Sequence, residues 1–132
     1  KINRPRYDDS WERWNRTLKM LSTLGTRTVL RITLIRGYND DEEMIPAFAS
    51  LLRQSNAHFV EIKSYMHIGR STNRLEHSDM LEMHEIRSFA NKLVQENNAF
   101  TVMDESEISR IVILQNKKRF IDRFIPACTQ TN

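Results

Sequence analysis

The chain has 132 residues, 39% of them hydrophobic, and 20 lysines and arginines against 17 aspartates and glutamates give a formal net charge of +3 at pH 7. This length suffices for one globular core, and the apolar runs fall far short of the roughly 20 residues that cross a bilayer. The single cysteine, Cys128, can form no internal disulfide and cannot alone supply the thiolates of a zinc site or an iron-sulfur cluster. We expect a cytoplasmic monomer and, because the first residue is Lys1, a processed chain or a piece of a longer one.

Three helices are predicted by apolar residues that recur at helical spacing. The first begins near Ser10 and ends before Gly25, and we expect its Trp11 and Trp14 to lie in a core or an interface. The second follows an acidic start near residue 41, and the third follows a polar loop over residues 67–78. The expected buried stripes are Ile45, Phe48, Ala49 and Leu52 in the second helix, and Ile86, Phe89, Ala90, Leu93 and Val94 in the third.

Four strands are predicted from β-branched and aliphatic runs, namely Thr28–Arg36, Phe59–Tyr65, Phe100–Asp104 and Ile108–Leu114. Together with the helices they give the order αβαβαββ. This alternation implies an α/β fold with right-handed crossovers and a largely parallel sheet. The remaining tail, residues 117–132, mixes basic and apolar side chains and could form a short docked helix or a fraying end.

Charged residues interrupt two strands that would read as nearly continuous apolar runs if helices covered both faces. Strand alternation places Arg31 and Thr33 on one face of the first strand, and Glu61 and Lys63 on one face of the second. If the apolar faces pack on helices, these four side chains share a face that no helix covers. Such a face could line a closed or half-closed barrel around a ligand, or it could hold a structural ion pair between Glu61 and either Arg31 or Lys63.

A polar loop over Met66–Arg74 leaves the carboxyl end of the second strand, the edge at which parallel sheets and barrels bind ligands. Gly69 permits close approach of a backbone. Side chains that can form hydrogen bonds follow it, namely Arg70, Ser71, Thr72, Asn73 and Arg74. The arginines carry forked donors suited to phosphate or carboxylate, while the competing interpretation is an ordinary solvated loop.

No metal-binding or catalytic motif is evident. No two of the four histidines have the i, i+4 spacing of a helical zinc site, and His84, near a helix start, is typical of a surface or capping residue. The sequence also has no catalytic triad pattern, P-loop or GxGxxG fingerprint, and no RNP-type or helix-turn-helix pattern.

Four segments resemble, in order and spacing, 4-demethylwyosine synthase, the radical S-adenosylmethionine enzyme of tRNA wybutosine biosynthesis. They are Thr28–Asn39 (TVLRITLIRGYN), Phe59–Leu75 (FVEIKSYMHIGRSTNRL), Met80–His84 and Asp104–Leu114 (DESEISRIVIL). The resemblance runs from about residue 7 to residue 114 and corresponds to the C-terminal portion of that enzyme.

Two positions depart from the family's pattern. Members commonly have glycine at the position of Ser64 and proline soon after the position of Met80, where this chain has Leu81. These two departures affect the local turn and any role that the resemblance would imply for His84.

The resemblance implies that residues 1–116 are the C-terminal part of a partial (β/α) barrel with a family-specific extension, followed by a basic tail over residues 117–132. In the family a [4Fe-4S] cluster on a CxxxCxxC motif cleaves S-adenosylmethionine, and the resulting radical joins carbons from pyruvate to N1-methylguanosine in phenylalanine tRNA. The cluster cysteines have no counterpart in this chain, so we expect it to be inactive alone and to bind no metal itself.

The resemblance also assigns candidate roles to residues. Those near S-adenosylmethionine or substrate in the lumen are Arg31, Thr33, Glu61, Lys63 and Met66. Those that contact the tRNA or its modified base are Arg70, Ser71, Asn73, Arg74 and His84. The alternative is a non-catalytic RNA-binding or interaction module that has kept the barrel end and its basic rim.

Overall fold

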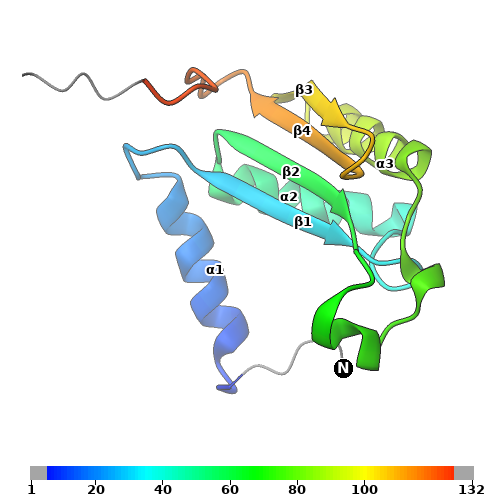
Figure 1. Cartoon of the computed structure of the whole chain (residues 1–132). Helices are drawn as coiled ribbons and strands as arrows, with labels where there is room; N and C mark the ends of the chain where they lie inside the picture. Colours follow the sequence, from blue (N-terminus) through cyan, green and yellow to red (C-terminus); the bar gives the residue numbers. More distant parts are fainter. Residues whose placement is uncertain (1–5, 127–132) are drawn as a thin grey trace, which may run out of the picture.

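The computed structural model describes residues 6–126. Three helices and four strands follow the predicted order (Figure 1). They are α1 (Ser10–Leu21), β1 (Val29–Leu34), α2 (Ile45–Ser55), β2 (Phe59–Ser64), α3 (Met83–Glu96), β3 (Phe100–Ser106) and β4 (Ile111–Asn116), with the 3-10 turns η1 (Glu42–Met44), η2 (Gly69–Asn73) and η3 (His77–Asp79) between them.

The sheet has the strand order β1-β2-β4-β3. β1 and β2 are parallel, whereas β4 is antiparallel to both β2 and β3, so the expectation of a largely parallel sheet is wrong. Residues 107–110 alone connect β3 to β4, which is too short for a crossover and forces a hairpin. Ile108, expected in the last strand, lies in this turn and is 94% exposed, and Arg110 adopts a φ of 50° at its end.

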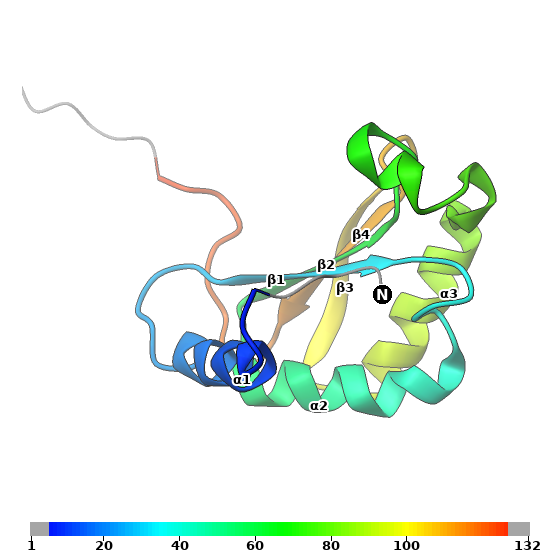
Figure 2. The same cartoon turned by 90° about the horizontal axis from the view of Figure 1, so that it is seen from below.

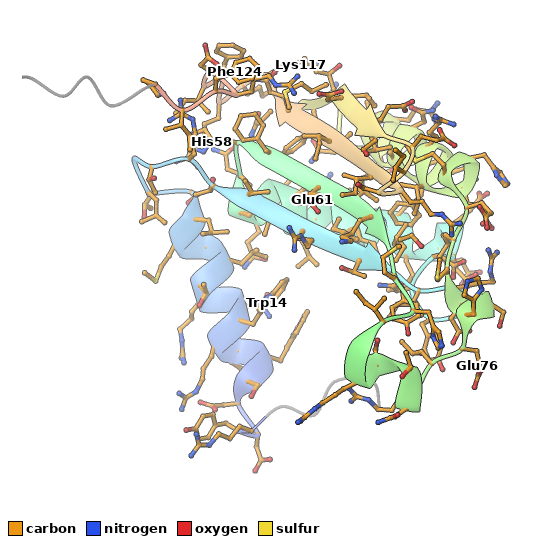
Figure 3. All side chains as sticks on the ribbon, viewed as in Figure 1. Trp14, His58, Glu61, Glu76, Lys117 and Phe124 are labelled. Atoms are coloured by element: carbon orange, nitrogen blue, oxygen red, sulfur yellow. The ribbon has the colours of Figure 1, made fainter. Side chains whose placement is uncertain are left out.

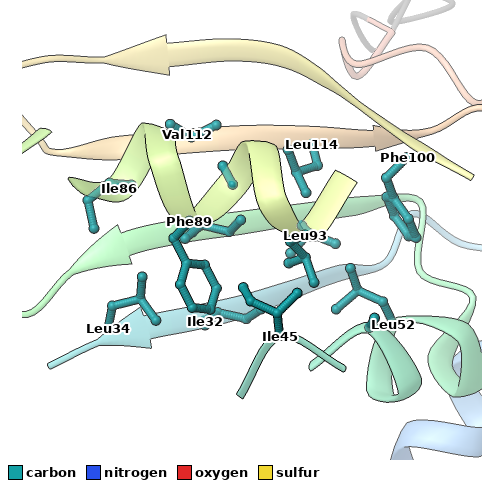
Figure 4. Close-up of a cluster of buried hydrophobic side chains, with 14 of the residues drawn as sticks. Ile32, Leu34, Ile45, Leu52, Ile86, Phe89, Leu93, Phe100, Val112 and Leu114 are labelled. Atoms are coloured by element: carbon teal, nitrogen blue, oxygen red, sulfur yellow. The ribbon is translucent and has the colours of Figure 1, made fainter. Parts of the chain in front are cut away.

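All three helices lie on one side of the sheet, and no helix of the described residues covers the other side (Figure 2). α2 and α3 pack against the sheet, and α1 packs against α2 beside the β1 edge. The core between these layers contains the predicted stripes of α2 and α3, with Phe48 and Val94 only partly buried. The strand side chains that face it are Ile32, Leu34, Val60, Ile62, Phe100, Val112 and Leu114 (Figure 4).

Local sequence explains where the two packed helices begin and end. Pro46 occupies the first turn of α2, where its missing N–H costs no hydrogen bond, and Asn56 ends the helix in the left-handed conformation with a φ of 45°. Glu82 and Glu85 form a capping box at the start of α3. These caps fix the two helices against the sheet and leave its other face open.

The tryptophans of α1 are not part of this core. Trp11 and Trp14 are 62% and 41% exposed, and their rings stack on each other with centroids 5.1 Å apart. Trp14 also lines a mainly apolar hollow of about 200 Å³ beside β1, together with Leu30, Ile32 and Phe48. The edge strand β1 therefore has an apolar rim.

The described part of the tail, residues 117–126, contains no helix. It is held to the body by Arg119, which donates hydrogen bonds to the backbone oxygens of Leu21 (3.0 Å), Asn56 (2.8 Å) and Leu24. Cys128 lies outside the described residues. The tail up to residue 126 is thus an extended segment anchored to the ends of α1 and α2.

His58 is buried where β1 and β2 begin. Its Nδ1 accepts a hydrogen bond from the backbone N–H of Thr28 at 3.1 Å, so this nitrogen carries no proton. Burial lowers the pKa of His58, and the positive charges of Arg119 and Arg27 lower it further. The folded protein therefore holds this ring neutral at pH values where a free histidine is protonated.

This arrangement predicts a loss of stability in mild acid. Above about pH 6.5 His58 is neutral in both the folded and the unfolded chain. Between that pH and the lowered pKa of the folded protein, only the unfolded chain takes up the proton. The free energy of unfolding should therefore fall as pH falls through this window, as measured by urea unfolding. His58→Gln should flatten the dependence, whereas His84→Gln, at an exposed histidine, should leave it unchanged; equal slopes in all three proteins would refute the assignment.

Candidate functional site on the open sheet face

The four predicted strand residues do share the helix-free face. Arg31 lies opposite Glu61 in the β1–β2 register, and Thr33 lies opposite Lys63. Arg31 Nη2 and Glu61 Oε2 are 3.0 Å apart, which settles the alternative left open by the sequence in favour of Arg31 as the partner of Glu61. The Glu61 side chain is only 14% exposed, at the centre of the face (Figure 3).

Lys63 differs from Arg31 in having no carboxylate within ion-pair distance among residues 6–126. It lies between Thr33 on β1 and Ile111 on β4, closer to the carboxyl ends of β1 and β2. The face thus combines a carboxylate that is already paired, an ammonium group whose charge is not neutralised by a described side chain, and a hydroxyl. Such a set can bind a ligand that carries both charged and polar groups.

The Met66–Arg74 loop stands at the carboxyl ends of β1 and β2, as predicted (Figure 1). Ser71 Oγ donates to the Ile68 backbone oxygen at 2.7 Å and accepts from Tyr65 Oη at 3.2 Å, so this side chain holds the loop together. Arg70 is exposed, and Gly69 has a φ of 62° with nothing near its missing Cβ. The loop is therefore internally braced and still presents an exposed arginine.

The other proposed contact residues do not form one cluster. Asn73 and Arg74 are exposed in the same loop, and Met66 is half-buried at its start. His84 lies on the helix side instead, where it lines a hollow of about 250 Å³ with residues of η1 and α2. The structure thus groups the loop residues near the open face and leaves His84 apart from them.

A clamp centred on Arg36 was missed by sequence reasoning. Arg36 follows β1 and donates to the backbone oxygens of Ser78 (3.0 Å) and Met80 (2.9 Å), and its guanidinium binds both carboxylate oxygens of Glu85. The hydrogen bonding to the Arg36 guanidinium holds the pKa of Glu85 below its usual range. The clamp fixes the segment that returns from the loop to α3, and the one sequence signal was an arginine at the end of the predicted strand Thr28–Arg36.

The two departures from the family's pattern turn out to be coupled. Ser64 is fully buried at the end of β2, and its Oγ accepts a hydrogen bond from the Leu81 backbone N–H at 2.8 Å. A proline at position 81 would have no N–H and a glycine at position 64 would have no hydroxyl, so neither residue could form this bond. Arg110 completes the junction by donating to the Leu81 oxygen at 3.0 Å.

Residues 6–126 have neither a candidate metal site nor a candidate membrane span. They contain no group of three or more histidine, cysteine, aspartate or glutamate side chains that could hold a metal ion. No helix among them is long and apolar enough to span a bilayer.

Comparison with known proteins finds that the chain is similar to one class of tRNA-modifying enzyme. Residues 54–116, which include β2, the loop, α3 and the hairpin, match the family model described as wyosine base formation. Among curated proteins, the S-adenosyl-L-methionine-dependent tRNA 4-demethylwyosine synthase of Methanocaldococcus jannaschii is 45% identical over 113 residues, which are 84% of this chain and 35% of that protein. The mouse enzyme TYW1 is 34% identical over 123 residues, or 92% of this chain and 17% of that protein.

Solved structures agree with these matches. A structure of TYW1 with a lysine-pyruvate adduct bound superposes with a TM-score of 0.76 at 42% identity, covering 87% of this chain and 35% of that one. A crystal structure of archaeal TYW1 gives a TM-score of 0.69 at 39% identity with the same coverage. The chain is thus similar to tRNA 4-demethylwyosine synthases over most of its own length, and it spans about a third of the length of the archaeal proteins that it matches.

Proposed function

We propose that this chain forms the C-terminal part of a tRNA 4-demethylwyosine synthase, which condenses pyruvate carbons with N1-methylguanosine in phenylalanine tRNA. The observation that carries the proposal is the helix-free polar face of β1 and β2, with the Arg31–Glu61 pair and Lys63 next to an arginine-bearing loop. The family match and the relative with a lysine-pyruvate adduct support it. In this proposal the protein is a cytoplasmic monomer.

The open face would form one wall of a partial (β/α) barrel. β1 is an edge strand, so no strand among residues 6–126 pairs with its outer side, and the apolar rim around Trp14 and Leu30 lies beside it. Sheet edges are normally paired or covered. A preceding parallel strand of the longer protein would pair with β1, close the rim and turn the open face into a lumen.

The residues of this face fit S-adenosylmethionine but not its iron-sulfur cluster. Arg31, Thr33, Glu61, Lys63 and Met66 offer charged, hydroxyl and apolar contacts suited to a cofactor that carries a carboxylate, an ammonium group and ribose hydroxyls. A [4Fe-4S] cluster needs cysteine thiolates, and residues 6–126 contain no cysteine. We therefore assign the cluster, which supplies the electron for cleavage of S-adenosylmethionine, to residues upstream of this chain.

In the proposed mechanism this chain binds and orients S-adenosylmethionine and the tRNA, and it keeps water out of the site. Once closed into a lumen, the face would keep solvent from the reacting groups, because a carbon radical must be protected until it reaches its substrate. The loop at the carboxyl end of the barrel lies where a bulky anionic RNA can approach, and Arg70 and Arg74 would contact its phosphates.

The full-length protein that contains this chain provides the test. Supplied anaerobically with S-adenosylmethionine, a reductant, pyruvate and phenylalanine tRNA that carries N1-methylguanosine, it should convert that base to the tricyclic product, as detected by mass spectrometry of the digested tRNA. Arg70→Ala and Arg74→Ala should each weaken tRNA binding several-fold and reduce the magnitude of the negative slope of log affinity against log salt by about 1. Cleavage of S-adenosylmethionine should persist in both variants.

The control for these variants is Arg87→Ala, because Arg87 lies on α3, outside the loop, and pairs with Glu105 and Glu107. Its tRNA affinity should equal that of the parent protein. Unchanged affinity in both loop variants would mean that Arg70 and Arg74 do not contact the tRNA. An upstream sequence without CxxxCxxC would refute the enzymatic role and favour an RNA-binding module.

A further inference from the structure

A second polar hollow lies at the opposite end of the sheet from the Met66–Arg74 loop. It has a volume of about 360 Å³ and opens between the last turns of α2 and α3, the start of β3 and the end of β4. Phe100 and Leu52, which belong to the buried core (Figure 4), are among its lining residues. This volume lies within the range of small-molecule sites.

Asn97 places an unsatisfied donor in the wall of this hollow. The residue is 5% exposed, and its Nδ2 is the one buried side-chain nitrogen or oxygen among residues 6–126 without a hydrogen-bond partner. The amide is oriented by its Oδ1, which accepts the Ala99 backbone N–H at 3.3 Å. A buried donor without an acceptor is destabilising, so an acceptor supplied by a ligand or a water would stabilise Nδ2.

The side-chain amide of Asn116, which also lines the hollow, forms all its hydrogen bonds within the chain. Asn116 is 1% exposed, and its Nδ2 donates to Asn56 Oδ1 at 2.9 Å and to the Ala57 oxygen at 3.0 Å. Its Oδ1 accepts from the backbone N–H groups of Lys118 and Arg119. Asn116 therefore needs no ligand and braces the hollow, whereas Asn97 is left open to one.

The charges around the hollow favour a negatively charged ligand. Arg53 and Lys118 line it, and neither forms an ion pair with a described residue. Glu96 is its one lining carboxylate. The partial negative charge at the end of α2 is offset by Arg119, whose guanidinium donates to the Asn56 oxygen at 2.8 Å.

We propose that this hollow binds a small ligand through an oxyanion group, either a phosphate or a carboxylate, which accepts from Asn97 Nδ2 and is neutralised by Arg53 and Lys118. The donor set matches the acceptor geometry of both groups, since an arginine can donate two parallel hydrogen bonds to either one. The site is separate from the open sheet face and does not depend on the proposed function.

The test is a titration of the full-length protein, labelled with ¹⁵N-asparagine, with inorganic phosphate and separately with acetate, at constant ionic strength maintained with chloride. The side-chain amide signals that disappear in Asn97→Asp identify Asn97. These signals should shift with saturation in one of the two titrations. A response to phosphate identifies a phosphate ligand, and a response to acetate identifies a carboxylate.

The variants separate a bound anion from a general salt effect. Asn97→Asp keeps the acceptor for Ala99 but replaces the donor, so it should abolish binding. Lys118→Ala and Arg53→Ala, at exposed positions that do not threaten folding, should each weaken binding about tenfold. Lys117→Ala and Asn91→Asp, at exposed residues that do not line the hollow, should bind like the parent. Signals that move in neither titration, or that move equally in all the variants, would overturn the proposal and leave an ordered water as the partner of Nδ2.

Discussion

Replacement of Leu93 by alanine should lower the free energy of unfolding by about 2 to 5 kcal/mol. Leu93 is fully buried on α3, where it packs between the sheet and α2 (Figure 4). Alanine is a good helix former, so the loss measures the deleted contacts and the cavity rather than the helix. Chemical denaturation of the two proteins gives the difference.

Ile108→Ala is the matched control for this change. Ile108 is a similar aliphatic residue that is 94% exposed in the β3–β4 turn, so its truncation should alter stability by less than about 0.5 kcal/mol. Comparable losses in the two variants would mean that the helix–sheet layer is not the main source of stability.

Arg36→Ala should produce the second large effect, a loss of about 2 kcal/mol in unfolding free energy, because hydrogen bonds to charged groups contribute about 1.5 to 3 kcal/mol. The substitution removes the partner of Glu85 and the donors to Ser78 and Met80 at once. Solvent screening limits the loss, since the Arg36 side chain is 42% exposed. Hydrogen exchange should rise in residues 76–82.

Arg87→Ala separates the clamp from an ordinary surface ion pair. Arg87 is 40% exposed and binds Glu105 with two nitrogens, so it matches Arg36 in exposure and in its carboxylate contact. Among residues 6–126 it donates to no backbone oxygen of a distant loop, so its removal should destabilise the protein clearly less than the removal of Arg36. Equal losses would show that the loop carbonyls contribute nothing to the role of Arg36.

Sequence reasoning succeeded where the signal was local. Alternation over a few residues placed Arg31 and Glu61 on one face, and helical spacing identified Ile86, Phe89 and Leu93 as core. Both patterns depend on the geometry of one element, in which side chains repeat every second residue or every turn. The sequence also predicted the position of the Met66–Arg74 loop correctly, because the direction of β2 determines the edge of the sheet at which the loop lies.

The features that sequence reasoning missed join distant parts of the chain. The choice of β4 rather than β3 as the neighbour of β2 depends on how a hairpin docks as a unit, which no single strand encodes. Arg36 and Arg119 likewise act on backbone oxygens more than 40 positions away, and any backbone oxygen can accept such a bond. Asn97 was overlooked because an unsatisfied donor is visible only once its surroundings are known.

The anchoring of the tail by Arg119 also bears on the order in which the molecule assembles. The hydrogen bond from Arg119 to Leu21 joins residues 98 positions apart, so it closes nearly the whole described chain into one loop. Such distant closures cost the most chain entropy and tend to form after local contacts. During synthesis, α1 would leave the ribosome well before Arg119 but would reach its final position only once Arg119 has emerged.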